Sequence, residues 1–489
     1  PPLPLWERGQ GGEGVHFRNF WGRTKRAQLQ DALDNPAAYP YQPLDPPLAI
    51  GLPFLLGQVE ADYFDWPLLT DLLPTSFPGV QSKRDDVVVD INKEQLVARM
   101  RIYFDAAVSD SEIVQLIPRA MERTNQAFDP VRTRKHLVAR GFLPEYISRY
   151  CFHPFDMRWI YWEPETDLLG RKSPDFWPNV FDGNTFLEAR RRESLDQFAR
   201  GYVSSVLSDN FGNGFSNFFP LYLRASSQPK SLFDLEIDPR DLGDGRRLNL
   251  SDAAVAYLSS LGGMSDAEAL FYHSIAVLHA PAYRAENAGA LRQDWPRVPL
   301  PASRALLLAS AELGRQVAAL LDNERPVVGV TSGAIRDELR TIGVLSVVGG
   351  EQLNPAAGDL DLTAGWGFAG RGGITMPGKG RVSARATKPE EEHPALGLGA
   401  GASTYDIALN ERAYWRNLPP RVWEYTIGGY QVIKKWLSYR ERPLLGRGLS
   451  PDEARAVTQI ARRIAAILLL EAELDAHYRR VAADTDEGR

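Results

Sequence analysis

The sequence predicts an α+β fold with several lobes and a long C-terminal helix. Three observations lead to this prediction. The 489 residues are too many for a single small core. The 41 glycines and 35 prolines are typical of a chain with many loops. A helical pattern free of Gly and Pro then runs from Asp452 to Ala483.

Composition excludes several classes of protein. With 44% hydrophobic and 24% charged residues, the chain lies in the globular range and is not wholly disordered. No apolar run approaches the roughly 18 residues of a membrane-spanning helix, so no membrane partner is expected. A lone cysteine, Cys151, excludes a disulfide scaffold and fits a reducing cytoplasm. The net charge of -6 gives no global positive field, so a nucleic acid would have to bind at local basic patches.

Elements are expected in the following order. The Pro/Gly-rich residues 1–14 predict a disordered lead-in. The β-branched run Asp86–Ile91 predicts a buried strand, and Lys93–Phe104 and Pro130–Tyr150 predict helices. Aromatic clusters alternate with turns over Cys151–Leu223, which predicts a sheet with loops.

The second half of the chain contains three capping signals. Ser265 is expected to cap a helix over Asp266–Leu278, and Ser303 one that ends at Leu321. The segment Ser450-Pro451-Asp452-Glu453 has the residues of a capping box and starts the last helix. Between the helix that ends at Leu321 and the last helix, Val327–Ala400 combines short β-type runs with frequent glycine. This pattern predicts small β-structure with mobile loops.

These patterns divide the chain into five expected parts. They are a lead-in (1–14), an N-terminal α/β lobe (15–149), a central lobe (150–325), a Gly-rich segment of strands and loops (326–400) and a C-terminal helical lobe (401–489).

No catalytic centre is predicted. Gly365–Gly370 matches a dinucleotide-binding pattern, but Arg371-Gly372-Gly373 follows where a helix should begin. Asp45-Pro46-Pro47-Leu48 resembles the loop that holds a flipped base in amino-methyltransferases, yet it lacks the stacking aromatic residue. The seven histidines show no metal-binding spacing. Carboxylates are plentiful, but nothing selects one pair, so we expect neither a cofactor nor a metal in this chain.

Five blocks combine Gly, Pro, aromatic residues and Arg in an unusual way. The third contains Leu278-His279-Ala280-Pro281-Ala282-Tyr283-Arg284, which looks like an element of DNA adenine methyltransferases with fused specificity domains. In this order the blocks resemble the C-terminal target-recognition (specificity) region of type ISP restriction–modification enzymes. The blocks are Phe77–Asp85, Phe152–Trp162, Phe271–Pro301, Ala364–Arg381 and Val422–Leu437.

The resemblance implies a DNA target-recognition architecture and double-stranded DNA as the partner. Enzymes of the family are bacterial, cleave DNA after ATP-driven translocation, and methylate adenine with S-adenosylmethionine. Their nuclease, motor and methyltransferase motifs do not occur in this sequence, so S-adenosylmethionine, ATP and Mg are expected only for domains supplied by another chain or lost.

Basic and amide side chains within and near these blocks are the candidate DNA contacts. For Arg158, the alternative to DNA contact is a buried ion pair with Asp156. For Arg190, the alternative is a position on a solvated helix face with Arg191 and Arg192. Arg371, Lys379 and Arg381 lie on a glycine-rich segment that we expect to order on binding. The full set is Lys83, Arg84, Arg158, Arg190, Arg371, Lys379, Arg381, Gln431, Lys434 and Lys435.

Three functions remain open from the sequence. The first is a DNA-recognition module that presents a cationic, concave ribbon shaped to the B-form duplex. The second is a truncated remnant that does not bind DNA, or an interaction scaffold. The third is an enzyme: part of an active site-specific DNA adenine methyltransferase, or a hydrolase with unfamiliar motifs.

Overall fold

The computed structural model describes residues 15–18, 20, 24–44, 59, 61–123, 126, 128–192, 200–211, 215–225, 238–371 and 374–484. The predicted lead-in 1–14 and the motif Asp45–Leu48 lie outside these residues. Among the described helices, none is long and apolar enough to cross a membrane.

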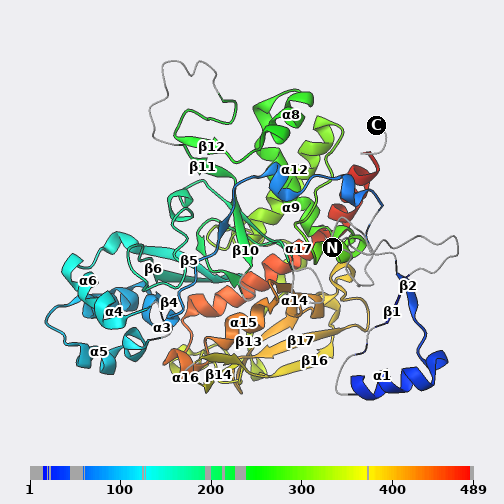
Figure 1. Cartoon of the computed structure of the whole chain (residues 1–489). Helices are drawn as coiled ribbons and strands as arrows, with labels where there is room; N and C mark the ends of the chain where they lie inside the picture. The colour runs from blue at the N-terminus through cyan, green and yellow to red at the C-terminus, as the bar shows by residue number, and fades with distance from the viewer. Residues whose placement is uncertain are drawn as a thin grey trace, which may run out of the picture.

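The first described segment is a small unit (Figure 1). Strands β1 (Val15–Phe17) and β2 (Gln42–Leu44) pair antiparallel on either side of helix α1 (Lys25–Asp34). The short helix α2 (Leu69–Leu72) follows and begins the larger body of the chain.

A helical lobe comes next and lies at the left of Figure 1. Side chains cap three of its helices, because Asn92, Ser109 and Asp129 accept hydrogen bonds from the first-turn amides of α4, α5 and α6. The helices are α3 (Asp85–Val88), α4 (Lys93–Phe104), α5 (Asp110–Leu116) and α6 (Pro130–Arg140).

Two four-stranded sheets form the centre of the molecule. The first has the order β4-β6-β5-β9 and the second β3-β10-β7-β8. A two-stranded ribbon, β11–β12, continues from the second sheet. The strands are β3 (Phe77–Pro78), β4 (Val89–Asp90), β5 (Ile147–His153), β6 (Asp156–Tyr161), β7 (Phe186–Arg190), β8 (Val203–Ser204), β9 (Leu207–Ser208), β10 (Ser216–Pro220), β11 (Tyr222–Arg224) and β12 (Arg246–Leu248).

A group of helices packs beside the second sheet. The central pair is α9 (Glu268–His279) and α12 (Arg304–Leu321). These two helices approach so closely that a Cβ on Gly314 would lie 1.8 Å from the Tyr272 carbonyl oxygen. The other members are α8 (Asp252–Ser260), α10 (Pro281–Glu286) and α11 (Ala288–Leu291).

The C-terminal part contains a third four-stranded sheet, with the order β13-β18-β17-β16, and two hairpins, β14–β15 and β19–β20. Its strands are β13 (Val344–Val347), β14 (Gly367–Ala369), β15 (Thr375–Pro377), β16 (Val382–Ala386), β17 (Ser403–Ala408), β18 (Ala413–Leu418), β19 (Thr426–Ile427) and β20 (Tyr430–Gln431). Its short helices are α13 (Asp337–Arg340), α14 (Pro420–Trp423), α15 (Val432–Ser438) and α16 (Arg442–Leu445).

The last helix, α17 (Pro451–Asp484), holds the parts together. It crosses the middle of the molecule between the α9–α12 pair and the third sheet (Figure 1). The predicted capping box is present: the Glu453 carboxylate accepts from the Ser450 amide at 2.8 Å, and Ser450 Oγ accepts from the Glu453 amide at 3.2 Å. Arg463 is buried and donates to carbonyl oxygens at the end of α12, so this arginine belongs to the core.

The predicted fold class is confirmed, as are the helix Lys93–Phe104 and the Ser303 cap. Strand β5 spans the expected boundary at 149/150, and the third sheet joins strands on both sides of 400/401. Buried apolar residues from Tyr63 to Tyr478 form one connected core. The expected lobes therefore share packing instead of folding around separate cores.

Three of the predicted elements are wrong in detail. Asp86–Ile91 is a strand only at β4 (Val89–Asp90), and the residues before it end helix α3. Arg99 donates to the carbonyls of Val87 and Val89 and fixes the turn between them. The helix from Pro130 ends at Arg140, since Gly141 has φ 90° and strand β5 starts at Ile147.

The third is the helix expected to start after Ser265. It begins at Glu268, behind a separate 3-10 turn that spans Met264–Asp266, so Ser265 is not its cap. The Ser265 hydroxyl donates to the Asp266 carboxylate instead.

Candidate nucleic-acid interface

Arg84 is part of the core and cannot reach a DNA phosphate in this fold. Its side chain is fully buried, and its guanidinium donates to the Leu168 carbonyl at 2.7 Å and to the Asp167 carbonyl at 3.2 Å. The guanidinium carbon lies 3.3 Å from the centre of the Phe128 ring. Burial lowers the pKa of Arg84 to about 10, so the group stays charged at neutral pH. Its neighbour Lys83 is exposed and remains a candidate contact.

Arg158 forms the buried pair that the sequence offered as an alternative to DNA contact. Its Nη2 donates to Asp156 at 2.7 Å, and Arg440 donates to the other oxygen of the same carboxylate at 2.6 Å. Burial alone would raise the pKa of Asp156, but the two guanidiniums outweigh it and hold the pKa well below its usual range. Arg158 also lies between the rings of Phe152 and Tyr439, at 3.9 and 4.4 Å. This arginine is structural.

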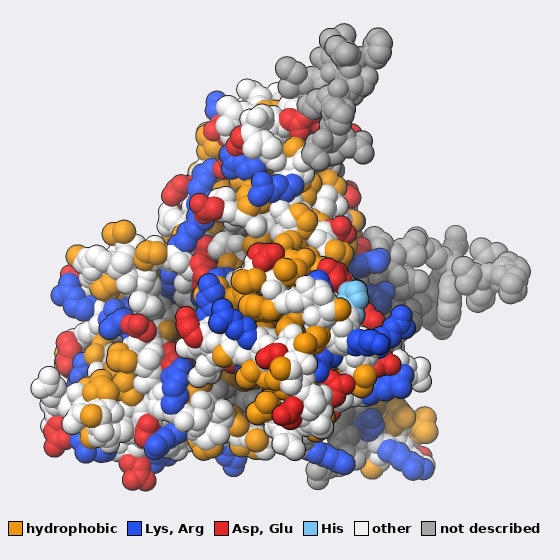
Figure 2. All heavy atoms as spheres, turned by 90° about the vertical axis from the view of Figure 1, so that its left-hand side faces the viewer, with side chains coloured by type: hydrophobic (Ala, Val, Ile, Leu, Met, Phe, Trp, Pro, Cys, Tyr) orange, Lys and Arg blue, Asp and Glu red, His pale blue; other side chains and the backbone are white. Residues whose placement is uncertain are grey.

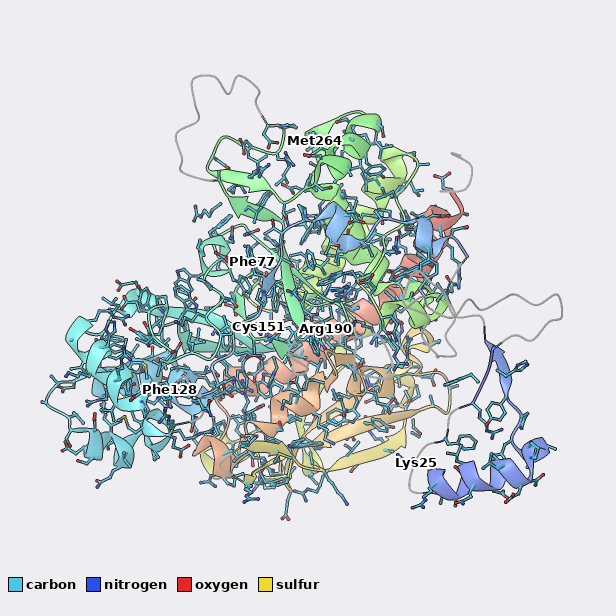
Figure 3. The ribbon with its side chains drawn as sticks, in the orientation of Figure 1. Lys25, Phe77, Phe128, Cys151, Arg190 and Met264 are labelled. Carbon is cyan, nitrogen blue, oxygen red and sulfur yellow. The ribbon has the colours of Figure 1, made fainter. Side chains whose placement is uncertain are left out.

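Arg190 is likewise buried, near the centre of the molecule (Figure 3). It ends strand β7, so the expected helix face does not exist here. Its Nε donates to Glu188 at 2.8 Å, and the same carboxylate accepts from Ser216 at 2.6 Å. The adjacent Arg191 is exposed and pairs with Asp294 at 3.3 Å.

Gln431, Lys434 and Lys435 lie on and beside the β19–β20 hairpin, and all three are half-buried. The Gln431 amide nitrogen donates to the Trp423 carbonyl at 2.7 Å, so its donor is already used within the fold. Lys435 lies over the rings of Tyr430 and Tyr439, and burial lowers its pKa. The two lysines are only partly exposed, because α15 packs into the core through Val432, Ile433, Trp436 and Leu437.

Arg371, Lys379 and Arg381 are exposed, and they surround the hairpin β14–β15. Its register pairs Gly367 with Pro377 and Ala369 with Thr375. Over residues 362–389 the sequence has five basic residues and no acidic one. Arg385 is paired with Asp406 and Glu391, so the local positive charge of this stretch comes from the other four basic residues, on a chain with net charge -6.

The base of the hairpin is tightly packed, so these residues do not lie on an unconstrained loop. A Cβ on Gly367 would lie 1.8 Å from the Ser438 carbonyl oxygen, and one on Gly380 would lie 2.0 Å from the Trp366 ring. Trp366 is fully buried, and its indole N–H donates to the Ala408 carbonyl at 2.9 Å. The described part of the hairpin is therefore already ordered and does not need to become ordered on binding DNA, contrary to what was expected.

A cleft of about 570 Å³ lies beside the hairpin. Ile374 and Thr375 line one side, and residues of the helical lobe and the first sheet line the rest, including Lys83, Arg119 and Asp209. Burial raises the pKa of Asp209 to about 8, although its carboxylate accepts from the Tyr150 hydroxyl at 2.8 Å. At neutral pH this carboxyl is therefore mostly protonated, and the cleft is less acidic than its sequence suggests.

On one face of the molecule, basic side chains are dispersed. Figure 2 shows the side of the molecule that lies at the left of Figure 1, and there Lys and Arg alternate with acidic and apolar side chains. This face does not present the cationic, concave ribbon that was expected from the sequence. Within the described ranges, no group of three His, Cys, Asp or Glu residues could hold a metal ion.

The sequence interpretation missed several residues around the hairpin. Phe368, Ile374 and Met376 are exposed on it, and Arg119 lines the cleft while pairing with Asp86 at 3.5 Å. The signal that could have found the hairpin was the absence of acidic residues over 362–389.

The site is thus a hairpin with a tightly packed base on an α+β scaffold. The chain belongs to the family of Type ISP C-terminal specificity domains, whose family model matches residues 71–465. The resemblance carried by the five sequence blocks is confirmed. Among curated proteins, none matches the chain.

The solved structures that share the fold include the following three. The Type ISP restriction–modification enzyme LlaGI, as a nuclease-deletion mutant with a DNA substrate mimic, aligns with TM-score 0.53 and 16% identity over 92% of this chain and 38% of its own. The ATP-dependent Type ISP enzyme LlaBIII bound to DNA aligns with TM-score 0.56 and 15% identity over 92% and 27%. DrdV in its DNA complex aligns with TM-score 0.58 and 16% identity over 95% and 42%. The chain thus spans less than half the length of each.

Proposed function

We propose that the chain recognises a sequence in double-stranded DNA as the specificity module of a Type ISP restriction–modification system. The observation that carries the proposal is the hairpin β14–β15, whose base is fixed and which lies in a stretch of sequence, 362–389, with five basic residues and no acidic one. Family membership supports it, as do DNA-bound enzymes that share the fold.

The proposed contacts fall into two classes. Arg371 lies next to the turn of the hairpin, where a side chain enters a groove first and reaches base edges. Lys379, Arg381 and Lys83 lie farther back and supply phosphate contacts, which position the domain without reading sequence. The two-stranded ribbon itself has the width that the major groove of B-DNA admits.

Chemistry on the DNA would belong to other domains. We propose that a methyltransferase using S-adenosylmethionine modifies an adenine near the bound site, and that an ATP-dependent motor with Mg acts with it, in a bacterial cytoplasm. In this arrangement the specificity module supplies the sequence choice and no reacting group.

The test measures binding of the whole chain to a pool of random duplexes as salt is raised. Replacing Arg371, Lys379 and Arg381 together by Ala should weaken binding. It should also lower the slope of log K against log salt by about 0.9 for each phosphate that the variant no longer neutralises. Arg304→Ala is the matched control, because that arginine is exposed, pairs with Asp266 and starts helix α12 away from the hairpin. The absence of salt-sensitive binding by the unaltered chain would favour a non-binding remnant or scaffold instead.

A further inference from the structure

The hairpin β14–β15 carries an exposed apolar face. Phe368 is 53% exposed, Ile374 57% and Met376 44%. Phe368 and Met376 are cross-strand partners, and Ile374 stands two residues before Met376 on the same strand side. Because side chains alternate between the faces of a strand, the three side chains share one face, while Ala369 and Thr375 occupy the other.

Exposed apolar side chains gathered on one small ribbon usually mark a contact surface. The face belongs to the acid-free stretch 362–389, and Arg371, Lys379 and Arg381 flank it in sequence. Beside Ile374, the cleft adds Lys83 and Arg119 together with Asp85 and Asp86. The partner that complements this surface is anionic at its rim and apolar at its centre. The major groove of duplex DNA has this pattern, with phosphates along both edges and the C5-methyl groups of thymine on its floor.

The face is already in place before any partner binds. The glycines at the base of the hairpin pack against Ser438 and Trp366, and the Gly370 amide donates to the Ile374 carbonyl at 2.7 Å, close to the turn. A Cβ on Gly370 would also collide with the Met376 side chain, which therefore lies across the glycine. Ordering the contact surface thus costs little conformational entropy on binding.

We infer that Phe368, Ile374 and Met376 are specificity determinants that read thymine in the major groove through its C5-methyl group. The inference rests on the proposed function, since it needs the hairpin to bind duplex DNA. Thymine alone among the four bases carries a methyl group in that groove, so an apolar face discriminates it without hydrogen bonds. Burying one methyl group contributes roughly 0.8 kcal/mol, which is about a fourfold difference in affinity for each thymine contacted.

The experiment compares thymine with uracil, which lacks only this methyl group. Duplexes are enriched from a random pool by binding to the whole chain and are then copied with either dTTP or dUTP. The unaltered chain should bind the thymine copies about fourfold more tightly for each methyl group buried. The variant Phe368→Ser/Ile374→Ser/Met376→Ser should bind both copies equally, at an affinity close to that of the unaltered chain for the uracil copies.

Ala369→Ser is the matched control, because residue 369 stands on the opposite face of the same hairpin and should keep the preference for thymine. Circular dichroism and thermal melting show whether the triple variant is folded. Equal binding of both copies by the unaltered chain would overturn the inference and leave the proposed function intact. Enrichment of sites that contain no thymine would have the same meaning. Failure to enrich any duplex would instead contradict the proposed function itself.

If the triple variant is unfolded, binding of the thymine and uracil copies by the unaltered chain still tests whether the methyl group of thymine is read. A further arm then replaces Ile374 alone by Val, which shortens one apolar side chain. This variant should reduce the preference for thymine without abolishing it. An unchanged preference in a folded Ile374→Val protein would remove Ile374 from the contact surface.

Discussion

Gly367 lies against the backbone of Ser438, so that a Cβ on the glycine would be 1.8 Å from the Ser438 carbonyl oxygen. This contact joins the first strand of the basic hairpin to the end of helix α15. Gly367→Ala must therefore displace the hairpin or the helix. We expect a decrease of about 1–3 kcal/mol in the free energy of unfolding, measured with denaturant, together with weaker DNA binding.

The control for this substitution is Gly399→Ala. At position 399 nothing lies within 4 Å of the added Cβ, so stability and binding should be unchanged or slightly improved. If Gly367→Ala behaved like Gly399→Ala in both measurements, the hairpin base would not be the fixed support described above.

Lys83 and Arg84 are neighbours in sequence, and opposite effects are expected from replacing each by Ala. Arg84→Ala leaves the Leu168 and Asp167 carbonyls without their donor and exposes Phe128, so it should destabilise the fold by roughly 1–3 kcal/mol. Lys83→Ala removes an exposed charge and should change stability by less than about 0.5 kcal/mol.

Binding should show the reverse order. Lys83→Ala is expected to lower the salt dependence of DNA binding if Lys83 contacts a phosphate, while Arg84→Ala should leave affinity unchanged at a temperature where it is folded. A stable Arg84→Ala protein unable to bind DNA would contradict the structural role of Arg84.

Asp209 gives the protein a specific dependence of stability on pH. Its pKa is about 8 in the folded state and about 4 in an unfolded chain, so the folded state holds a proton that the unfolded state releases between these values. Its contribution to stability is therefore fully present below about pH 4 and is lost as the pH rises towards 8.

Asp209→Asn removes this titration and keeps an oxygen that accepts from the Tyr150 hydroxyl. The melting temperature of the unaltered protein, relative to that of Asp209→Asn, should fall steadily from pH 5 to about 8. A constant difference between the two proteins over this range would show that the folded protein does not hold the proton.

Arg371 and Arg381 are expected to differ in what they contact. Arg371→Ala should weaken binding to enriched duplexes by roughly 1–3 kcal/mol and affect random duplexes less, since it lies at the turn and reads a base. Arg381→Ala should weaken binding to both kinds of duplex equally, as a phosphate contact does. Titrations of both variants against both pools decide between these roles, and an unchanged affinity of either variant would remove that arginine from the interface.

Much of the fold could be predicted from local sequence signals. The last helix could be predicted because Ser450 and Glu453 form its capping box and no Gly or Pro interrupts it. The turn that replaces the expected strand near Val87 could not be predicted, because it depends on Arg99. This arginine lies on a neighbouring helix and donates a hydrogen bond to the Val87 carbonyl. Such a tertiary contact overrides the β preference of a valine run.

The candidate site was predicted less well, for a physical reason. Arginine is long enough to be buried with its charge satisfied, so a dense Arg and aromatic block predicts a core cluster as readily as a DNA contact. Arg84, Arg158 and Arg190 all belong to buried clusters of the core. Only the acid-free segment around Arg371 indicated an exposed basic surface, because no carboxylate stands nearby in sequence to neutralise it.

Site-directed cross-linking tests the central claim most directly, since Cys151 is the only cysteine and is fully buried. A photoactivatable thiol reagent on Ile374→Cys places the probe on the exposed face of the hairpin, and Ser259→Cys on helix α8 is the control. If the hairpin contacts duplex DNA, position 374 should cross-link to it, excess unlabelled duplex should suppress the cross-links, and position 259 should give none. DNA binding without cross-links from position 374, or equal cross-linking from both positions, would contradict the claim.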